Sequence, residues 1–484
     1  MLTGERKMNQ TQHYITGISH RLHALIQQLE ELSHLDFPSN SPIVLSEILK
    51  RILLRLFNDL SDLNSSIDQS PSQDIFEKAK TINFAIIFIG KLTESIHGAQ
   101  ISSTSLPMSS IIEAFEDICG QIAYSTKVII YPQWDLNATF FDVIPQLKKL
   151  SKYINKGDTV EIFRGEPSHI PIITFPTIEG KNYLRQSILA HEVGHFADAT
   201  YSFSENIIRK CKDVVIKRNE SQLMSPKSRK IAIGVIETWI PEIVADVIGL
   251  NIVGPAYIFA FDDVMHIPPS LANPFLSQTH PPFGLRAKLT AEYCLDSLIQ
   301  PLLLAEELRE LEENGVHSLN FLKSWLEYLG QQNGTDVTFS GLELPEKEQK
   351  AVFSVGKNAL ELGVNFMHQE MENLGAKDWI CTYDDIKDAI KLQVYLDNGL
   401  PPSELSFQNN EIKRYPTFAA IMNSGWIYFF RNENKYSYFD ENTSFLEPGE
   451  VFEKYLKVQK LIAKAVENYL FRKEYMKRRG KCNE

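Results

Sequence analysis

The chain has 484 residues and a formal net charge of −12, and 43% of its residues are hydrophobic and 23% charged. This balance excludes a disordered chain, and the length predicts two or three domains, because a single core seldom grows to this size. The negative charge argues against a general affinity for nucleic acid or for an anionic membrane surface, since both favour a basic protein.

The N-terminal quarter has the pattern of helices. Apolar residues from Ile48 to Leu63 recur at the three- and four-residue spacing of a buried helical face. Prolines accompanied by serine interrupt this pattern at three places, residues 37–40, 70–72 and 105–107. We therefore expect four helices that form a bundle over residues 1–126, with no chemistry of its own.

A change of pattern near Lys127 marks the next part of the chain. Short β-prone runs occur at residues 128–131, 160–163 and 170–175. Helical patterns return at residues 183–201, at 229–249 and from 285 onward. These elements predict a core with a small sheet over residues 127–300.

The last part of the chain, residues 301–484, is expected to be mostly helical and has no evident role. It contains one β-like aromatic run at 426–430 and closes on a charged helix at 449–477. The fold class that follows for the whole chain is α+β, mainly α.

The cysteines and the apolar runs of the sequence help to predict the cellular compartment of the protein. The five cysteines form no Cys-x-x-Cys pair, so neither a disulfide framework nor a thiolate zinc motif is expected. The first thirty residues lack a continuous apolar core, which argues against a signal peptide. The longest apolar runs, such as 82–90 and 252–261, fall short of the roughly 18 residues of a membrane helix. We expect a cytoplasmic protein without a membrane span.

Two histidines stand four residues apart in segment 188–197, Ile-Leu-Ala-His-Glu-Val-Gly-His-Phe-Ala. On a helix, His191 and His195 point the same way, so their neutral imidazoles can supply two ligands of a tetrahedral zinc site. Glu192 lies one residue round the helix, where it can act as a general base on a zinc-bound water without binding the metal. The alternative is a pair of core histidines that hydrogen-bond to backbone or carboxylate groups.

A second segment carries two carboxylates at the same spacing. Glu242 and Asp246 share one face of a helix whose other residues are apolar. Carboxylates in such a stretch are costly unless they bind a cation or a hydrogen-bond donor. We therefore predict Glu242 as the third zinc ligand and Asp246 as the acceptor of the free ring N–H of a ligating histidine. Glu237 is the rival third ligand, and two solvent-exposed acids are the simpler alternative.

The two segments together resemble the gluzincin metallopeptidases, in which a His-Glu-x-x-His helix precedes a helix with Glu-x-x-x-Asp. The chain is most similar to the family of the CAAX-processing protease and the HtpX heat-shock protease, because residues 279–286 carry the His-Pro segment and the arginine that follow the glutamate helix there. The resemblance spans residues 125–295 and implies a zincin-like metallopeptidase core. It also implies that His280 and Arg286 lie near the metal and steady the oxyanion of the tetrahedral intermediate.

The function implied by this resemblance is hydrolysis of peptide bonds in a protein or peptide substrate. Zn²⁺ would be the cofactor, and a zinc-bound water activated by Glu192 would attack the scissile carbonyl. The membrane helices of the family are missing, so a soluble relative is expected. Metzincins have a glycine and a metal ligand where this chain has Asp198 and Tyr201, and the Gly-x-Met-Glu-Asn stretch of the aminopeptidases is also missing. We therefore prefer an endopeptidase.

The strand predicted just before the histidine helix has a further expected role. In zincin folds this region is an edge strand that pairs with an extended substrate. Pro171 and Pro176 flank the strand, as expected of a protected edge. An ordinary internal strand is the alternative.

Two other functions remain open. The chain can be a catalytically inactive, zinc-stabilised helical protein with an interaction or regulatory role, because about two thirds of it lies outside the resemblance. Otherwise the motif is a coincidence in a structural helical protein, which requires three matched elements in the right order to be accidental.

Overall fold

The fold is described from a computed structural model of the chain. The described residues are 2–37, 39–66, 72–102, 106–124, 126–133, 139–154, 163–176, 182–212, 214, 225–265, 280–304, 313–331, 344–375, 377–405, 415–433 and 448–481. They form two compact units: an N-terminal unit of residues 1–116 and 124–180, and a C-terminal unit of residues 117–123 and 181–484. The protein is mainly helical with a small three-stranded sheet, which confirms the expected α+β, mainly α class.

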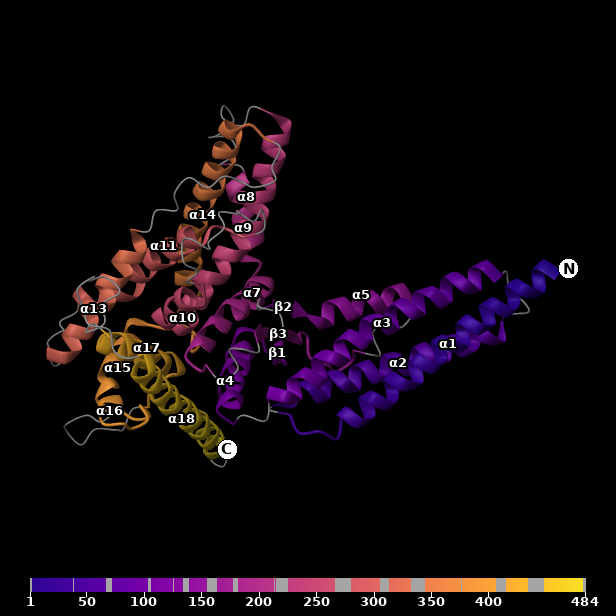
Figure 1. Cartoon of the computed structure of the whole chain (residues 1–484), viewed down its shortest axis with the longest axis horizontal. Coiled ribbons are helices and arrows are strands. Elements are labelled where there is room, and N and C mark those ends of the chain that lie inside the picture. The colour runs from indigo at the N-terminus through magenta and orange to yellow at the C-terminus, as the bar shows by residue number, and fades with distance from the viewer. Residues whose placement is uncertain are drawn as a thin grey trace. The chain divides into compact units, whose positions relative to one another are not determined.

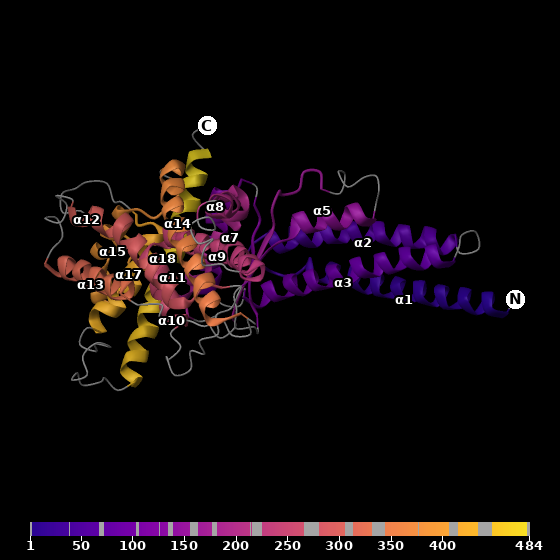
Figure 2. The ribbon, with the colours of Figure 1, turned by 90° about the horizontal axis from the view of Figure 1, so that it is seen from above.

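Three long helices of the N-terminal unit lie side by side: α1 (Leu2–Leu32), α2 (Ser41–Ser65) and α3 (Ser72–Ser102) (Figures 1 and 2). The fourth helix, α4 (Leu106–Ile122), begins in this unit and ends in the other. The four helices are as predicted, except that residues 106 and 107 of the third expected break belong to α4. Helix α2 shows why: its buried residues include Ile48, Ile52 and Leu56, which lie on one face at helical spacing.

The sheet consists of β1 (Ile129–Gln133), β2 (Thr139–Asp142) and β3 (Pro171–Pro176) in the order β1-β3-β2. β3 runs parallel to β1 and antiparallel to β2. It is therefore the central strand, and the prediction of an edge strand at 170–176 is wrong. Pro171 and Pro176 are its first and last residues, where a missing backbone N–H leaves the middle of the ladder intact, so both neighbours can pair.

The sheet belongs to the core of the N-terminal helices. Ile129 and Ile172 are buried in the same cluster as the apolar faces of α1, α2 and α3, together with helix α5 (Val143–Ile154). The Tyr131 ring packs directly on Gly98 of α3, and its hydroxyl lies 3.1 Å from Ser95 Oγ. The N-terminal unit therefore contains the strands and helix α5 of the expected 127–300 core, whereas the later helices of that core belong to the same unit as residues 301–484. The boundaries of the three expected domains stay predictions, and residues 160–162 of the expected run 160–163 lie outside the described residues.

The described part of the C-terminal unit is helical. After the 3₁₀ turn Arg185–Ile188, its helices are α7 (Leu189–Tyr201), α8 (Phe203–Cys211), α9 (Pro226–Val253), α10 (Pro255–Met265), α11 (Phe283–Cys294), α12 (Gln300–Leu304), α13 (Glu313–Gly330), α14 (Glu346–Leu374), α15 (Tyr383–Lys391), α16 (Gln393–Asp397), α17 (Phe418–Glu433) and α18 (Pro448–Lys481). No helix among the described residues combines the length and the apolarity needed to cross a lipid bilayer.

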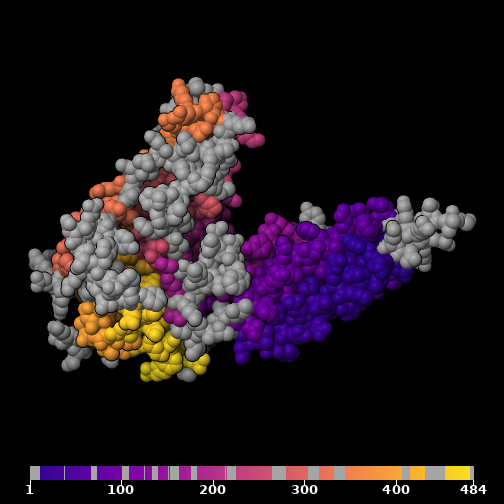
Figure 3. Space-filling model, in the orientation of Figure 1, coloured from indigo at the N-terminus to yellow at the C-terminus, as the bar shows by residue number. Residues whose placement is uncertain are grey.

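For two helices of the C-terminal unit, the sequence predictions have opposite outcomes. The aromatic run 426–430 lies in α17, so its prediction as a β-like stretch is wrong. Trp426 and Ile427 are fully buried, and α17 packs against α10, α15 and α18, which leaves no polar stripe to reveal the helical period. The charged helix predicted at 449–477 is confirmed as α18, which Figure 3 shows in yellow at the surface of the C-terminal unit.

Candidate metal centre

The site is built on two helices, α7 and α9, whose backbones touch. A Cβ atom on Gly194 of α7 would lie 2.8 Å from Ala245 Cα of α9 and closer still to the Ala245 carbonyl oxygen. One turn away, a Cβ atom on Gly249 of α9 would lie 3.1 Å from His191 N of α7. Because only glycine lacks a Cβ atom, these two positions allow the helices to approach closely. The approach brings the histidine face of α7 up to the carboxylate face of α9.

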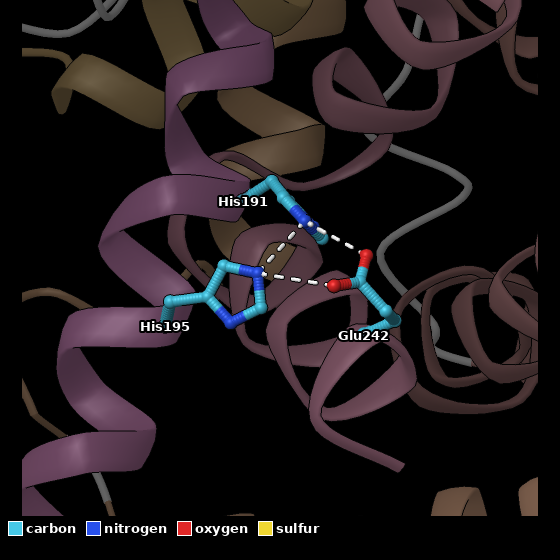
Figure 4. Close-up of side chains that lie close together, drawn as sticks. All are labelled: His191, His195 and Glu242. Atoms are coloured by element: carbon cyan, nitrogen blue, oxygen red, sulfur yellow. Dashed lines mark hydrogen bonds and ion pairs between the residues drawn. The ribbon is translucent and has the colours of Figure 1, made fainter. Parts of the chain in front are cut away.

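Three of the predicted residues converge where the helices meet (Figure 4). His191 Nε2 lies 3.1 Å from His195 Nε2 and 3.5 Å from Glu242 Oε2, and His195 Nε2 lies 3.7 Å from Glu242 Oε1. Ligand atoms about 2.0–2.1 Å from a tetrahedral zinc ion are roughly 3.3–3.5 Å apart. The observed separations are close to these values, and two imidazole Nε2 atoms this near each other can share one cation. The donor set therefore fits Zn²⁺.

Asp246 lies behind this cluster and is fully buried. Its Oδ1 atom is 2.9 Å from His191 Nδ1, an ion-pair distance, although among the described residues Nδ1 has no partner aligned as a hydrogen-bond acceptor. Arg286 of α11 donates to both carboxylate oxygens, from Nε to Oδ2 at 2.7 Å and from Nη2 to Oδ1 at 2.6 Å. The Tyr257 hydroxyl of α10 donates to Oδ1 as well. Nδ1 faces away from the ligand atoms, so Asp246 lies on the side of His191 that its predicted role requires, and the predicted hydrogen bond from the ring N–H stays a prediction.

Each of the other predicted site residues lies at or near Glu242. Arg286 is 4% exposed, and its Nη1 atom is 3.5 Å from Glu242 Oε2. The His280 side chain is 58% exposed, with Nε2 3.7 Å from Glu242 Oε1. Glu192 is 6% exposed and interacts electrostatically with His191 and Glu242. The structure thus brings the predicted residues together. Arg286 interacts with the carboxylates of Asp246 and Glu242, and the His280 side chain is exposed to solvent.

The rival third ligand lies elsewhere on α9. The Glu237 side chain is 50% exposed and pairs with Lys212 Nζ. It is not one of the residues whose ligand atoms converge with those of His191 and His195.

The two histidines have opposite ionisation behaviour. Burial acts to lower the pKa of His191, but its contacts with Asp246 and Glu242 prevail and raise that pKa to about 10. Burial, and then the neighbouring charge of His191, lower the pKa of His195 to about 3. In the metal-free protein the contacts of His191 therefore favour its positively charged imidazolium form, whereas the surroundings of His195 favour the neutral imidazole. A cation bound between them would replace a proton of that imidazolium.

The pKa values of the acidic residues at the site are also shifted in opposite directions. Burial acts to raise the pKa of Glu242, but the hydrogen bond and charge of His191 and the charge of Arg286 lower it to about 2. Burial also opposes ionisation of Asp246, and the charge and hydrogen bonds of Arg286 outweigh it, so its pKa lies well below the usual range. The pKa of Glu192 is raised, chiefly by burial. The ligand and its supporting acid are thus held ionised, while the raised pKa makes the predicted base a better proton acceptor than an ordinary glutamate.

Tyr257 is the residue of this cluster that sequence analysis missed. It lies in the apolar run 252–261, where a tyrosine is easily taken for an ordinary core aromatic. A buried tyrosine needs a hydrogen-bond partner for its hydroxyl, and that requirement was the available signal. Only the packing of α10 on α9 shows that the partner is Asp246.

Comparison with known proteins adds no relative. No family model, no curated protein and no solved structure matches this chain. The function is therefore argued from the residues and geometry of the site.

Proposed function

We propose that the chain is a zinc-dependent metallopeptidase of the gluzincin kind, an endopeptidase of the cytoplasm that acts on protein or peptide substrates. The observation that carries the proposal is the convergence of His191, His195 and Glu242 at separations suited to one tetrahedral ion. Two features of the site add support. Glu192, a general-base candidate, is next to a ligand in the chain, and Asp246 contacts the ligating imidazole from behind.

The chain's own residues would divide the work as follows. Bound zinc supplies a Lewis acid that polarises a carbonyl and makes a water more acidic. Glu192 accepts the proton of the attacking water and delivers it to the departing amine. Asp246 and Arg286 hold the ligands in place, because the guanidinium bridges Asp246 and Glu242. His280, whose side chain is the most exposed of the cluster, would donate to the developing oxyanion of a substrate.

Zinc content tests the ligand set. We expect about one zinc per chain in the wild-type protein and none in His195→Ala or Glu242→Gln, because a tetrahedral site with one protein ligand fewer holds zinc weakly. The measurement is elemental analysis of the purified protein after incubation with zinc and removal of the excess. Glu237→Gln is the matched control, since it removes a carboxylate of the same helix and should retain the ion. A wild-type protein that takes up no zinc, or a Glu237→Gln variant that alone loses it, would contradict the proposal.

Peptide hydrolysis separates an enzyme from an inactive zinc-stabilised protein. An unstructured protein substrate should be cleaved, cleavage should stop when a chelator removes the zinc, and it should return when zinc is restored. A zinc-loaded protein that cleaves no peptide library would favour the interaction or regulatory role.

His280→Ala is expected to leave the zinc content unchanged and to lower kcat by about 10²-fold, because one donor to an oxyanion has an effect of this order. Steady-state kinetics on a cleaved peptide provide the measurement. His317→Ala, which removes a histidine of α13, is the control and should keep full activity. Equal kcat values for the His280→Ala variant and the wild-type protein would remove His280 from the mechanism.

A further inference from the structure

Tyr257 contacts the metal centre through Asp246. Its side chain is fully buried, and its hydroxyl donates to Asp246 Oδ1. The same oxygen lies 2.9 Å from His191 Nδ1 and accepts from Arg286 Nη2 at 2.6 Å. The carboxylate therefore has donors on several sides, and Tyr257 is the one that carries no charge.

Packing against neighbouring rings fixes the orientation of the Tyr257 side chain and so of its hydroxyl. The Tyr257 ring is parallel to the His191 ring within 6°, at a centroid distance of 6.5 Å. It also stacks on Phe261, whose ring carries the Arg286 guanidinium 4.8 Å from its centroid. His191, Tyr257, Phe261 and Arg286 thus form one packed group around Asp246, in which a shift of one ring displaces the others.

The junction between α9 and α10 fixes the position of Tyr257. Gly254 joins α9 to α10 with φ of 63°, a conformation that favours glycine. Asn423 of α17 holds both sides of the junction, accepting from Ala256 N at 2.7 Å and donating to Val253 O at 2.8 Å. The start of α10, and with it Tyr257, is therefore placed by a third helix that provides none of the predicted metal ligands.

We propose that Tyr257 is a positioning residue of the zinc centre: its hydroxyl fixes the Asp246 carboxylate, which in turn orients the His191 imidazole toward the ion. This inference rests on the proposed function, because it requires that His191 binds zinc. Groups that orient a metal-ligating histidine typically contribute 10–100-fold to metal affinity. Without the hydroxyl, Asp246 keeps Arg286 but loses the donor that stops it from turning toward the guanidinium and away from His191.

The matched pair of variants is Tyr257→Phe and Tyr293→Phe. Tyr293 of α11 is also buried, and its hydroxyl accepts from Asn251 Nδ2 of α9 at 3.0 Å. Both variants remove one buried hydroxyl that bonds to α9, and neither changes the shape of a side chain by more than one oxygen atom. They differ in whether the lost partner touches the metal centre.

The test measures the zinc Kd of the full-length protein by competition with a chelator of known affinity, with circular dichroism as a check on folding. We expect Tyr257→Phe to raise the Kd by about 10–100-fold and Tyr293→Phe to leave it within about twofold of wild type. Equal Kd values for Tyr257→Phe and wild type would overturn the inference, and so would an equal rise in both variants, since that would indicate a general loss of packing. A wild-type protein that binds no zinc would instead overturn the proposed function.

Discussion

Glu192→Gln is expected to retain one zinc ion per chain and to lose about a thousandfold or more of kcat for peptide hydrolysis. The substitution keeps the size and hydrogen-bonding capacity of the side chain but removes the group that accepts a proton, and general-base catalysis contributes about 10²–10⁴-fold. Because Glu192 is not a metal ligand, elemental analysis should find as much zinc in the variant as in the wild-type protein. Wild-type activity in Glu192→Gln, or loss of its zinc, would show that the base has been assigned wrongly.

Thermal stability provides the control for this variant. The folded-state pKa of Glu192 lies above its unfolded value, chiefly because of burial. The contribution of this group to the stability of the folded state is therefore fully present below its unfolded pKa and is lost as the pH rises through the folded pKa. At neutral pH a buried carboxylate lowers the stability of the folded state, because burial disfavours its charge, and the neutral glutamine has no such charge. Metal-free Glu192→Gln should thus melt no lower than the metal-free wild-type protein at pH 7, so that a loss of activity cannot be ascribed to unfolding.

Gly194→Ala is expected to destabilise the protein and to weaken its zinc binding. The new methyl group would meet the Ala245 backbone, which cannot move aside as a flexible side chain can. Overpacking of this kind costs about 1–3 kcal/mol or more, whereas alanine gains about 1 kcal/mol over glycine inside a helix. The clash therefore outweighs the propensity. The helices must separate to relieve it, and this separation moves Glu242 away from both histidines.

Gly234→Ala is the matched control on α9. A Cβ atom at Gly234 would meet no atom within 4 Å, so that the variant should gain the helix propensity and melt slightly higher than wild type. Melting temperatures and zinc Kd values of the two variants provide the comparison. If Gly194→Ala melted at the wild-type temperature and bound zinc equally well, the close approach of α7 and α9 would not be what sets the geometry of the site.

The site was more predictable than its surroundings, because its residues obey a local rule. His191 and His195, and likewise Glu242 and Asp246, stand four apart on helices, and that spacing alone puts each pair on one face. No such local spacing predicts which residue Arg286 contacts. Its guanidinium bonds to Asp246, 40 residues earlier in the chain, and only the packing of α11 on α9 brings the two together.

The errors in the fold have a related cause. An edge position was expected for strand β3 because zincin folds have an edge strand in this region and a proline stands at each end of it, with an ordinary internal strand as the alternative. Whether a strand is central depends on its neighbours, and one of them, β2, had not been predicted at all. Helix α17 was taken for a β-like run because its aromatic segment is buried on most sides, and a segment of that kind shows neither the two-residue nor the 3.6-residue period.

The backbone contact between α7 and α9 also changes what a useful search signature for related chains would be. The usual pattern, His-Glu-x-x-His, leaves its fourth position free, but Gly194 has no room for a side chain. Gly249, which meets the Ala190 and His191 backbone, is three residues after Asp246 and restricts the second helix in the same way. A two-part signature of His-Glu-x-Gly-His followed by Glu-x-x-x-Asp-x-x-Gly would therefore select for the helix pair itself as well as for the ligands. Such a signature could find chains that share this centre even where the rest of their sequence has diverged beyond recognition.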